Sequence, residues 1–324
     1  MQIGLRGLLA RFPVRLPVPD LAPFLAGNLL PGAWSFGAAR PGPHVVVTAL
    51  VHGNEIAGAI VLAEWLRQGL RPRIGRLSLV FANLDAFARF DPEDPTMSRF
   101  VEEDLNRVWA PHVLDGPRTS LELARARELR PLVASADVLL DLHSMLWPSD
   151  PLLLVGRSVR AQALALSLGT PPVVVADDGH ADGLRLIDYP RFRDPASSAC
   201  GLLVEGGAHW EPGTPELLDR CGRALLRRLG LLEPAMPGTV LSGPAPDASL
   251  WRVTRTVTAR RHGFAFTESF RGGTVIPRRN TLIALDGEEE IRTPHDDCLL
   301  VMPSPRVLRG HTAVRLAARC CAER

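Results

Sequence analysis

Short apolar runs that alternate with helical segments restrict the folds open to this chain most strongly. Residues 45–50, 138–143 and 201–204 are rich in Val and Leu and have the length of strands buried on both faces. Further strands are predicted over residues 76–83, 151–155 and 172–176, and helices over residues 55–70, 120–133, 159–168 and 213–232. This alternation predicts an α/β fold with a mixed, mostly parallel sheet and helices on both faces.

The sequence pattern changes after the last predicted helix. Prolines and glycines are frequent between residues 234 and 246, and short alternating segments separated by Gly, Pro and Asp follow from residue 249. We therefore predict a large α/β domain over residues 1–235 and a small all-β domain over residues 236–324. The small domain either narrows the mouth of a functional site or has a purely structural or dimerising role.

The composition excludes several classes of protein. All 37 basic residues are arginine, which excludes enzymes that need a lysine amine, such as Schiff-base enzymes and P-loop NTPases. The net charge of +2 and the scattered arginines predict no nucleic-acid partner. No apolar run approaches the length of a membrane span, and the amino terminus has no clean signal-peptide core, so we expect no membrane partner and a cytoplasmic location. The five cysteines are odd in number and form no Cys-x-x-Cys pair, which argues against a disulfide framework.

A histidine and a glutamate follow the first predicted strand, three positions apart. His52 and Glu55 lie on the turn into the next helix, which in an open α/β sheet lies at the edge where ligands bind. His143 ends a second strand that should reach the same edge. A lone histidine at a strand end is more often structural, but the His-x-x-Glu pair favours metal binding here. Two histidines, a glutamate and water form a known catalytic zinc set, so we predict one zinc ion (Zn²⁺) per chain at this edge. Asp141 lies on the same strand face as His143 and is expected to hydrogen-bond that imidazole from behind.

Glu205 follows another apolar run and precedes two glycines. A carboxylate at such a place is either a solvated strand end or a general base. The glycines favour the general base, because they let a substrate and the backbone approach closely. The polar connection over residues 85–117 is also expected to be functional, because connections of this length in compact domains usually are.

Four motifs, taken together and in this order, resemble one known family. They are His52-Gly53-Asn54-Glu55, Asp104-Leu105-Asn106-Arg107, Asp141-Leu142-His143 and Val204-Glu205. The chain resembles the succinylglutamate desuccinylase/aspartoacylase family, which is related to the zinc carboxypeptidases, most strongly over residues 45–209. The resemblance implies a zinc carboxypeptidase-like fold for the large domain and makes it the zinc-hydrolase domain.

The resemblance also implies roles for individual residues. It implies His52, Glu55 and His143 as the zinc ligands and Glu205 as the acid/base, the same residues as derived above. In the polar connection, Arg99 would polarise the scissile carbonyl group, while Asn106 and Arg107 would bind a substrate carboxylate. Surface solvation is the alternative for the two arginines.

The region before Glu205 is where the chain departs most from the family. Family members commonly place a tyrosine near the substrate, and Tyr189 is the only tyrosine of this chain. The family can present a further substrate-binding arginine in the same region, for which Arg191 and Arg193 are the candidates. His209 either lines the pocket or is a structural histidine.

These patterns lead to one main hypothesis and two alternatives. The main hypothesis is a zinc-dependent hydrolase that cleaves the linear amide bond of a small N-acyl amino acid or related N-acyl amine, with a glutamate as general base. The alternatives are a zinc carboxypeptidase that acts on short peptides and a non-catalytic zinc- or ligand-binding module. Arg107 predicts a small-molecule substrate that carries a carboxylate, and a homo-oligomer is a further expectation.

Overall fold

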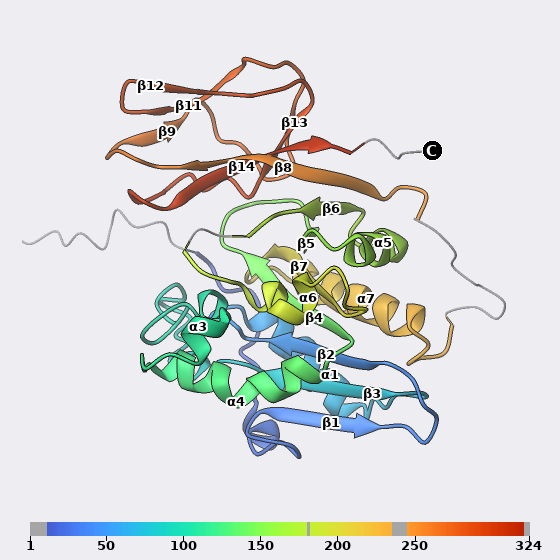
Figure 1. Ribbon diagram of the computed structural model, residues 1–324. Helices are drawn as coiled ribbons and strands as arrows, with labels where there is room; N and C mark the ends of the chain where they lie inside the picture. The colour runs from blue at the N-terminus through green and yellow to red at the C-terminus, as the bar shows by residue number, and fades with distance from the viewer. Residues whose placement is uncertain (1–11, 180–181, 235–244, 321–324) are drawn as a thin grey trace, which may run out of the picture.

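A large sheet runs through the structure and carries the strands that lead to the candidate site (Figure 1). The computed structural model describes residues 12–179, 182–234 and 245–320. In spatial order the large sheet contains β1 (Ala33–Gly37), β3 (Arg76–Phe81), β2 (His44–Ala49), β4 (Val138–Met145), β7 (Cys200–Ala208), β5 (Leu152–Val155), β6 (Val173–Ala176), β8 (Ser249–Thr258), β14 (Thr312–Arg319), β13 (Cys298–Val301) and β10 (Val275–Ile276). A second sheet contains β12 (Glu289–Arg292), β11 (Leu282–Asp286) and β9 (Phe264–Phe266).

The central strands of the large sheet are parallel. β2 pairs in parallel with β3 and β4, and β4 pairs in parallel with β7. β1 and β5 run antiparallel to β3 and β7, so the sheet is mixed. The carboxyl ends of β2, β4 and β7 therefore meet at one edge, the edge where ligands bind in open α/β sheets.

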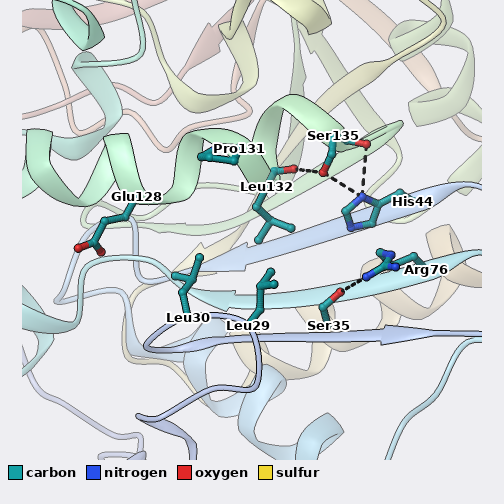
Figure 2. A pocket seen from close by; sticks show the side chains of 9 residues that line it. All are labelled: Leu29, Leu30, Ser35, His44, Arg76, Glu128, Pro131, Leu132 and Ser135. Atoms are coloured by element: carbon teal, nitrogen blue, oxygen red, sulfur yellow. Dashed lines mark hydrogen bonds between the residues drawn. The ribbon is translucent and has the colours of Figure 1, made fainter.

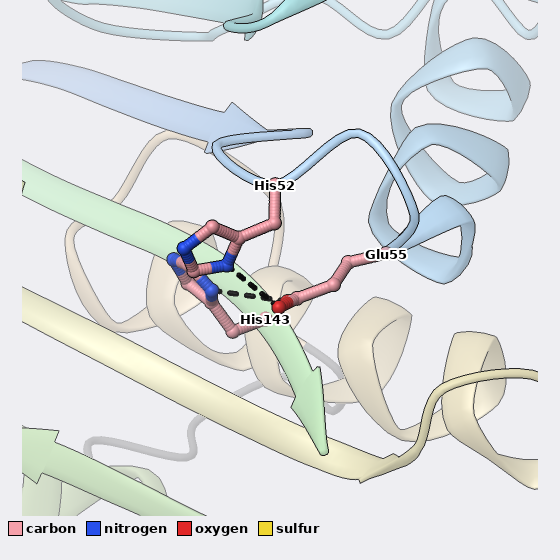
Figure 3. Close-up of side chains that lie close together, drawn as sticks. All are labelled: His52, Glu55 and His143. Atoms are coloured by element: carbon pink, nitrogen blue, oxygen red, sulfur yellow. Dashed lines mark hydrogen bonds and ion pairs between the residues drawn. The ribbon is translucent and has the colours of Figure 1, made fainter. Parts of the chain in front are cut away.

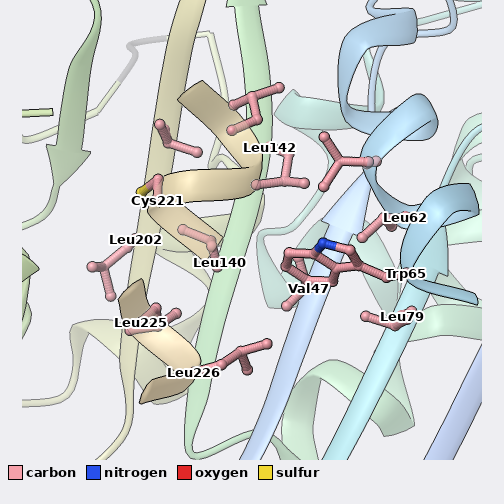
Figure 4. Close-up of a cluster of buried hydrophobic side chains, with 14 of the residues drawn as sticks. Val47, Leu62, Trp65, Leu79, Leu140, Leu142, Leu202, Cys221, Leu225 and Leu226 are labelled. Atoms are coloured by element: carbon pink, nitrogen blue, oxygen red, sulfur yellow. The ribbon is translucent and has the colours of Figure 1, made fainter. Parts of the chain in front are cut away.

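Helices cover both faces of these strands. One face carries α1 (Ile56–Arg67), α5 (Val159–Leu168) and α7 (Gly213–Arg228), and the other carries α4 (Leu121–Ser135). Neighbouring side chains of β2 point to opposite faces. Val47 packs in the apolar cluster that contains Trp65 and Leu225 (Figure 4), whereas Val46 packs in the cluster that contains Leu129. Strands buried on both faces need apolar side chains at every position, which explains the continuous apolar runs. The predicted α/β class, with its mixed sheet covered on both faces and the β region that follows, is confirmed.

Several short elements differ from the sequence prediction. The polar connection contains α2 (Leu84–Phe87), the 3-10 turn η3 (Leu105–Arg107) and α3 (Pro111–Leu114), and other short turns are η2 (Ala22–Phe24), η4 (Leu186–Asp188) and α6 (Pro190–Arg193). The sequence does not indicate β1, a five-residue edge strand that is mostly only partly buried. β7 continues to Ala208, so Glu205 lies inside a strand rather than after it. Among the described residues, no helix is both long and apolar enough to cross a membrane.

The C-terminal strands extend the large sheet. β8 pairs in parallel with β6, and β14, β13 and β10 follow in antiparallel order. These strands and the three-stranded sheet share an apolar cluster of their own, which includes Ile283, Leu300 and Leu316. The predicted boundary between residues 235 and 236 falls within 235–244, outside the described residues, so the division into two domains stays a prediction.

A hollow of about 400 Å³ lies between α4 and the β1 side of the sheet (Figure 2). His44 and Arg76 line it, and they are the first residues of β2 and β3. His44 Nε2 lies 2.9 Å from Ser78 Oγ there, and Nδ1 lies 3.3 Å from Ser135 Oγ. None of the predicted zinc ligands lines this hollow.

Candidate active site

The turn between β2 and α1 brings His52 and Glu55 together. Leu50 has a φ of 58°, which turns the chain sharply where β2 ends. Gly53 then lies against α2, and a Cβ atom there would be 2.4 Å from the carbonyl carbon of Ala86, so a larger residue does not fit. Glu55 is the N-cap residue of α1, and its amide donates to the His52 carbonyl at 3.1 Å. The turn thus points both side chains toward β4 (Figure 3).

His52, Glu55 and His143 converge on one point (Figure 3). His52 Nδ1 lies 2.7 Å from Glu55 Oε1, and His143 Nδ1 lies 3.0 Å from Glu55 Oε2. One candidate ligand atom from each residue lies within 4.8 Å of the other two, and all three residues are buried. Two imidazoles and a carboxylate form the donor set of known catalytic zinc sites, so these residues fit the predicted ion.

The three residues depend on one another electrostatically. Burial alone would raise the pKa of Glu55, but His143 and His52 outweigh it and hold that pKa well below its usual value. Burial would lower the pKa of His143, whereas Asp141 and Glu55 raise it well above its usual value. Glu55 therefore depends on positive charge from its neighbours. A metal cation held by the three residues would supply that charge in place of a proton.

Carboxylates also lie behind the two imidazoles. His143 Nε2 lies 2.8 Å from Asp141 Oδ2, and Asp141 Oδ1 accepts a hydrogen bond of 2.5 Å from Thr48 Oγ1. His52 Nε2 lies 3.0 Å from Asp104 Oδ1. Histidines that bind metal ions almost always have such a partner for their second ring nitrogen, because it fixes the orientation of the ring. Asp141 has the contact that the sequence predicted, and Asp104 adds a second one.

Glu205 faces the same site from the neighbouring strand. The parallel register of β4 and β7 pairs His143 with Glu205. Glu205 is 5% exposed, and within the described part of the chain its Oε2 atom accepts no hydrogen bond. Burial raises the pKa of Glu205 to about 8, with His143 opposing the shift and Glu55 adding to it. The glycine after it serves packing, because a Cβ atom at Gly206 would lie 2.6 Å from Leu218 Cδ2 of α7.

Arg99 reaches the metal ligands from the polar connection. Its Nη2 atom lies 2.8 Å from His52 Nε2 and donates to Asp104 Oδ2 at 3.2 Å, and its Nη1 atom lies 3.6 Å from Glu55 Oε1. The Arg99 carbonyl accepts a hydrogen bond of 3.1 Å from the amide of Gly53, so the connection is tied to the metal-ligand turn. Burial would raise the pKa of Asp104, but His52 and then Arg99 outweigh it and hold that pKa far below its usual value.

Asn106 and Arg107 lie beside Asp104 in η3. Asp104 Oδ1 accepts the Asn106 amide at 2.8 Å and so caps this turn. Asn106 is buried, and its Oδ1 atom accepts the Leu186 amide at 2.8 Å. Arg107 Nη1 donates to the Asn106 carbonyl at 2.7 Å, and Nη2 lies 4.0 Å from Asp104 Oδ2. Both side chains are thus fixed in place, next to the residues that contact His52.

The structure does not bring the three candidates before β7 to this site. Arg191 donates to the carbonyl of Ala136 and to Asp137 Oδ1, which lie at the amino end of β4. Arg193 is exposed on α6. Tyr189 is buried, and its ring packs edge-on against Trp109 at 6.3 Å. A substrate contact by these three residues remains a prediction without support from any contact described here.

Two further residues hold the ligand group from behind. The Ser144 amide donates to Glu55 Oε2 at 2.9 Å, and Ser144 Oγ lies 2.7 Å from His209 Nδ1. His209 is buried, and burial lowers its pKa to about 4, so it is neutral at physiological pH. Of the two interpretations of His209 left open by the sequence, the structural one matches this contact.

Arg315 is a residue that the sequence interpretation missed. It lies on β14, is buried, and its Nε atom lies 3.2 Å from Asp177 Oδ2, which also accepts from Arg185 Nη1 at 2.9 Å. Burial lowers the pKa of Arg315, and the charges of Asp177 and, more weakly, Glu205 oppose that shift. Burial also lowers the pKa of Arg107, and the charge of Arg315 adds to that shift. The sequence offered one signal for this buried charge, which is an arginine within the otherwise apolar segment 313–318.

Comparison with known proteins agrees with this geometry. The family model named "Succinylglutamate desuccinylase/Aspartoacylase catalytic domain" matches residues 41–186, which contain the three candidate metal ligands. A probable aspartoacylase of Synechococcus sp. strain CC9605 is 30% identical over 199 residues, which are 58% of this chain. The match covers 59% of that relative, less than two thirds of its length.

Two longer matches cover most of the chain. A succinylglutamate desuccinylase of Burkholderia cenocepacia is 26% identical, with 82% of this chain and 78% of the relative covered. The solved structure of the succinylglutamate desuccinylase from Chromobacterium violaceum has a TM-score of 0.65 at 20% identity, with 91% of each chain covered, so the two proteins share a fold. The order of the four motifs and the matched catalytic-domain model agree, and the chain is similar to the succinylglutamate desuccinylase/aspartoacylase family, most clearly over residues 41–186.

Proposed function

We propose that this protein is a zinc-dependent hydrolase that cleaves the amide bond of a small N-acyl amino acid or a related N-acyl amine. The observation that carries the proposal is the convergence of His52, Glu55 and His143 within 4.8 Å beside the buried carboxylate of Glu205. A catalytic zinc site needs three protein ligands and a nearby base, and these four residues supply both. The names of the relatives, an aspartoacylase and a desuccinylase, support the acyl-amine substrate class.

One zinc ion per chain would be held by His52 Nδ1, His143 Nδ1 and a Glu55 oxygen. The contacts of Asp141 and Asp104 support this choice of atoms, because they engage the other nitrogen of each ring. Zinc at this place would polarise a substrate carbonyl and acidify a water molecule, and its charge would lower the pKa of Glu205.

Residues of the chain would carry out the proton transfer and stabilise the charge that develops. Glu205 would accept a proton from the attacking water on its Oε2 atom and later deliver it to the departing amine. Arg99 would donate hydrogen bonds to the carbonyl oxygen as negative charge develops on it, which lowers the barrier most in a site shielded from water. The distance of 3.6 Å between Arg99 Nη1 and Glu55 Oε1 supports this proposed role.

Asn106 and Arg107 would bind a carboxylate of the substrate. The planar guanidinium of Arg107 can donate two parallel hydrogen bonds to a carboxylate. The Oδ1 atom of Asn106 is engaged by the Leu186 amide, so its Nδ2 group is the donor that remains for a ligand. Cytoplasmic location and a homo-oligomer remain predictions made from the sequence.

A hydrolysis screen tests the proposed reaction. The zinc-loaded protein would be assayed against N-acetyl, N-succinyl and N-formyl amino acids and against dipeptides. Release of free amino acid from the acylated compounds at a higher kcat/KM than from dipeptides is expected. Preference for dipeptides would instead favour the carboxypeptidase alternative, and no turnover of any compound would favour a non-catalytic module.

Glu205→Gln tests the general base in the same assay. The change keeps the shape of the side chain, so zinc binding should persist while kcat falls by roughly 10²- to 10⁴-fold. Glu211→Gln is a matched control, because Glu211 lies soon after β7, is only half-buried and pairs with Arg15. Turnover by E205Q at the wild-type rate would remove Glu205 from the mechanism.

A further inference from the structure

A buried carboxylate outside the metal site holds the segment that carries Arg99. Glu122 lies in the first turn of α4, and its residue is 1% exposed. Its Oε1 atom accepts the Val101 amide at 2.6 Å and Asn83 Nδ2 at 3.1 Å. Its Oε2 atom accepts the amides of the next two residues, Glu102 at 3.1 Å and Glu103 at 3.3 Å. Three successive backbone N–H groups therefore point at a single side chain.

These three amides lie between Arg99 and Asp104, the two residues of the polar connection that are described above as contacts of His52. Arg99 is two positions before Val101, and Asp104 follows Glu103 directly. Successive N–H groups that converge in this way form a site for an anion, and here the anion belongs to the chain itself. The contact is reciprocal, since Glu102 Oε2 accepts the Leu121 amide of α4 at 2.6 Å. Segment 101–103 and the start of α4 are thus tied together in both directions.

Glu122 is ionised under physiological conditions. Burial would raise its pKa, but the hydrogen bonds from Val101 and then Asn83 outweigh it and hold the pKa below its usual value. A charged acceptor makes each of these bonds stronger than a neutral acceptor would. The Glu122 carboxylate also lies at the amino end of α4, where the helix dipole favours a negative charge.

We propose that Glu122 is a positioning residue for the hydrolysis: it fixes segment 101–103 and so places the Arg99 guanidinium against the metal ligands. Arg99 lies between α2 and η3, outside both elements, and its carbonyl accepts a hydrogen bond from the Gly53 amide of the metal-ligand turn. Glu122 supplies the second anchor, on the other side of Arg99. This role rests on the proposed function of Arg99, but the anchor itself can be measured without turnover.

Glu122→Gln is the change that tests the anchor. Glutamine keeps the size of the side chain but offers one acceptor oxygen, and its amide donors would face the donors of Glu102 and Glu103. Amide hydrogen exchange over 101–103 should therefore accelerate by about tenfold or more, which corresponds to one lost hydrogen bond to a charged group. Glu128→Gln is the matched control, because Glu128 is exposed on the same helix. Unchanged exchange in E122Q would overturn the anchor, whatever the protein hydrolyses.

A double-mutant cycle with Arg99 tests positioning against a general loss of stability. In the wild-type background E122Q should lower kcat by roughly 10- to 100-fold, as a displacement of about 1 Å can, while the zinc content is unchanged. In an Arg99→Ala background the same change should cost less than about threefold, because its target is already absent. Glu122→Asp keeps the charge but shortens the reach, so it should fall between wild type and E122Q in both measurements. The proposal would be overturned if E122Q lowered kcat equally in both backgrounds. It would also be overturned if E122Q kept the wild-type kcat while its amide exchange over 101–103 accelerated. A wild-type protein without turnover would instead refute the proposed function.

Discussion

Asp141→Asn is the change that isolates how the chain prepares His143 for a metal ion. Asp141 is fully buried, and its two oxygens contact His143 Nε2 at 2.8 Å and Thr48 Oγ1 at 2.5 Å. Asparagine can retain both contacts, because its oxygen accepts from the imidazole and its amide donates to the Thr48 hydroxyl. The substitution therefore removes the negative charge while it keeps the shape and the hydrogen bonds.

The size of the effect follows from those contacts. A hydrogen bond to a charged group contributes about 1.5–3 kcal/mol, and one between neutral groups about 0.5–1.5 kcal/mol. The difference of about 1–2 kcal/mol corresponds to roughly 5- to 30-fold weaker zinc binding, because each 1.4 kcal/mol is about tenfold. Competition between the apo protein and a chromophoric chelator at pH 7 measures this ratio.

Asp137→Asn is the matched control for that measurement. Asp137 directly precedes β4, at the edge away from the metal ligands, and pairs there with Arg191. D137N should bind zinc as the wild type does. If D141N also binds zinc with wild-type affinity, Asp141 does not support His143 as a ligand and the reasoning about its charge is refuted.

Three further predictions follow from single contacts. Gly53→Ala should lower stability by about 1–3 kcal/mol in urea unfolding, because its Cβ would lie 2.4 Å from the Ala86 backbone; wild-type stability would refute that clash. Wild type should be more stable than E122Q, and this difference should be complete above pH 4.5, the ordinary pKa of Glu122. The difference should decline as the pH falls through the lower pKa that Glu122 has in the folded state. A constant difference from pH 7 to pH 3 would contradict the ionised anchor. Arg191→Ala should leave KM unchanged, because Arg191 is engaged at the amino end of β4, and a raised KM would restore it as a substrate ligand.

The parts of the fold that could be predicted from sequence are those with strong local patterns. β2 and β4 are buried on both faces, so nearly every position is apolar and the polar exceptions, such as Asp141 and His143, are conspicuous. β1 has five residues, mostly half-buried, and gives no comparable pattern. The short helices of the polar connection are likewise too brief to show a period.

The candidate site was predictable where its residues lie beside those strands. The contact of Asp104 with His52 joins positions 52 residues apart, through a connection whose course no local pattern reveals. Arg315 pairs with Asp177 from a strand more than a hundred residues beyond Glu205, and this contact depends on the order of strands in the sheet. Glu122 occupies a buried position of an amphipathic helix, and a charged residue there was a visible sign of a contact, but not of its partner.

Anomalous diffraction at the zinc absorption edge, from crystals grown with stoichiometric zinc, tests the central claim most directly. We expect one anomalous peak per chain, at about 2.0–2.2 Å from His52 Nδ1, His143 Nδ1 and a Glu55 oxygen. A protein with His143→Ala should lose that peak. A wild-type map with no peak among these three residues, or with the zinc bound elsewhere, would contradict the proposed metal site and the hydrolysis that depends on it.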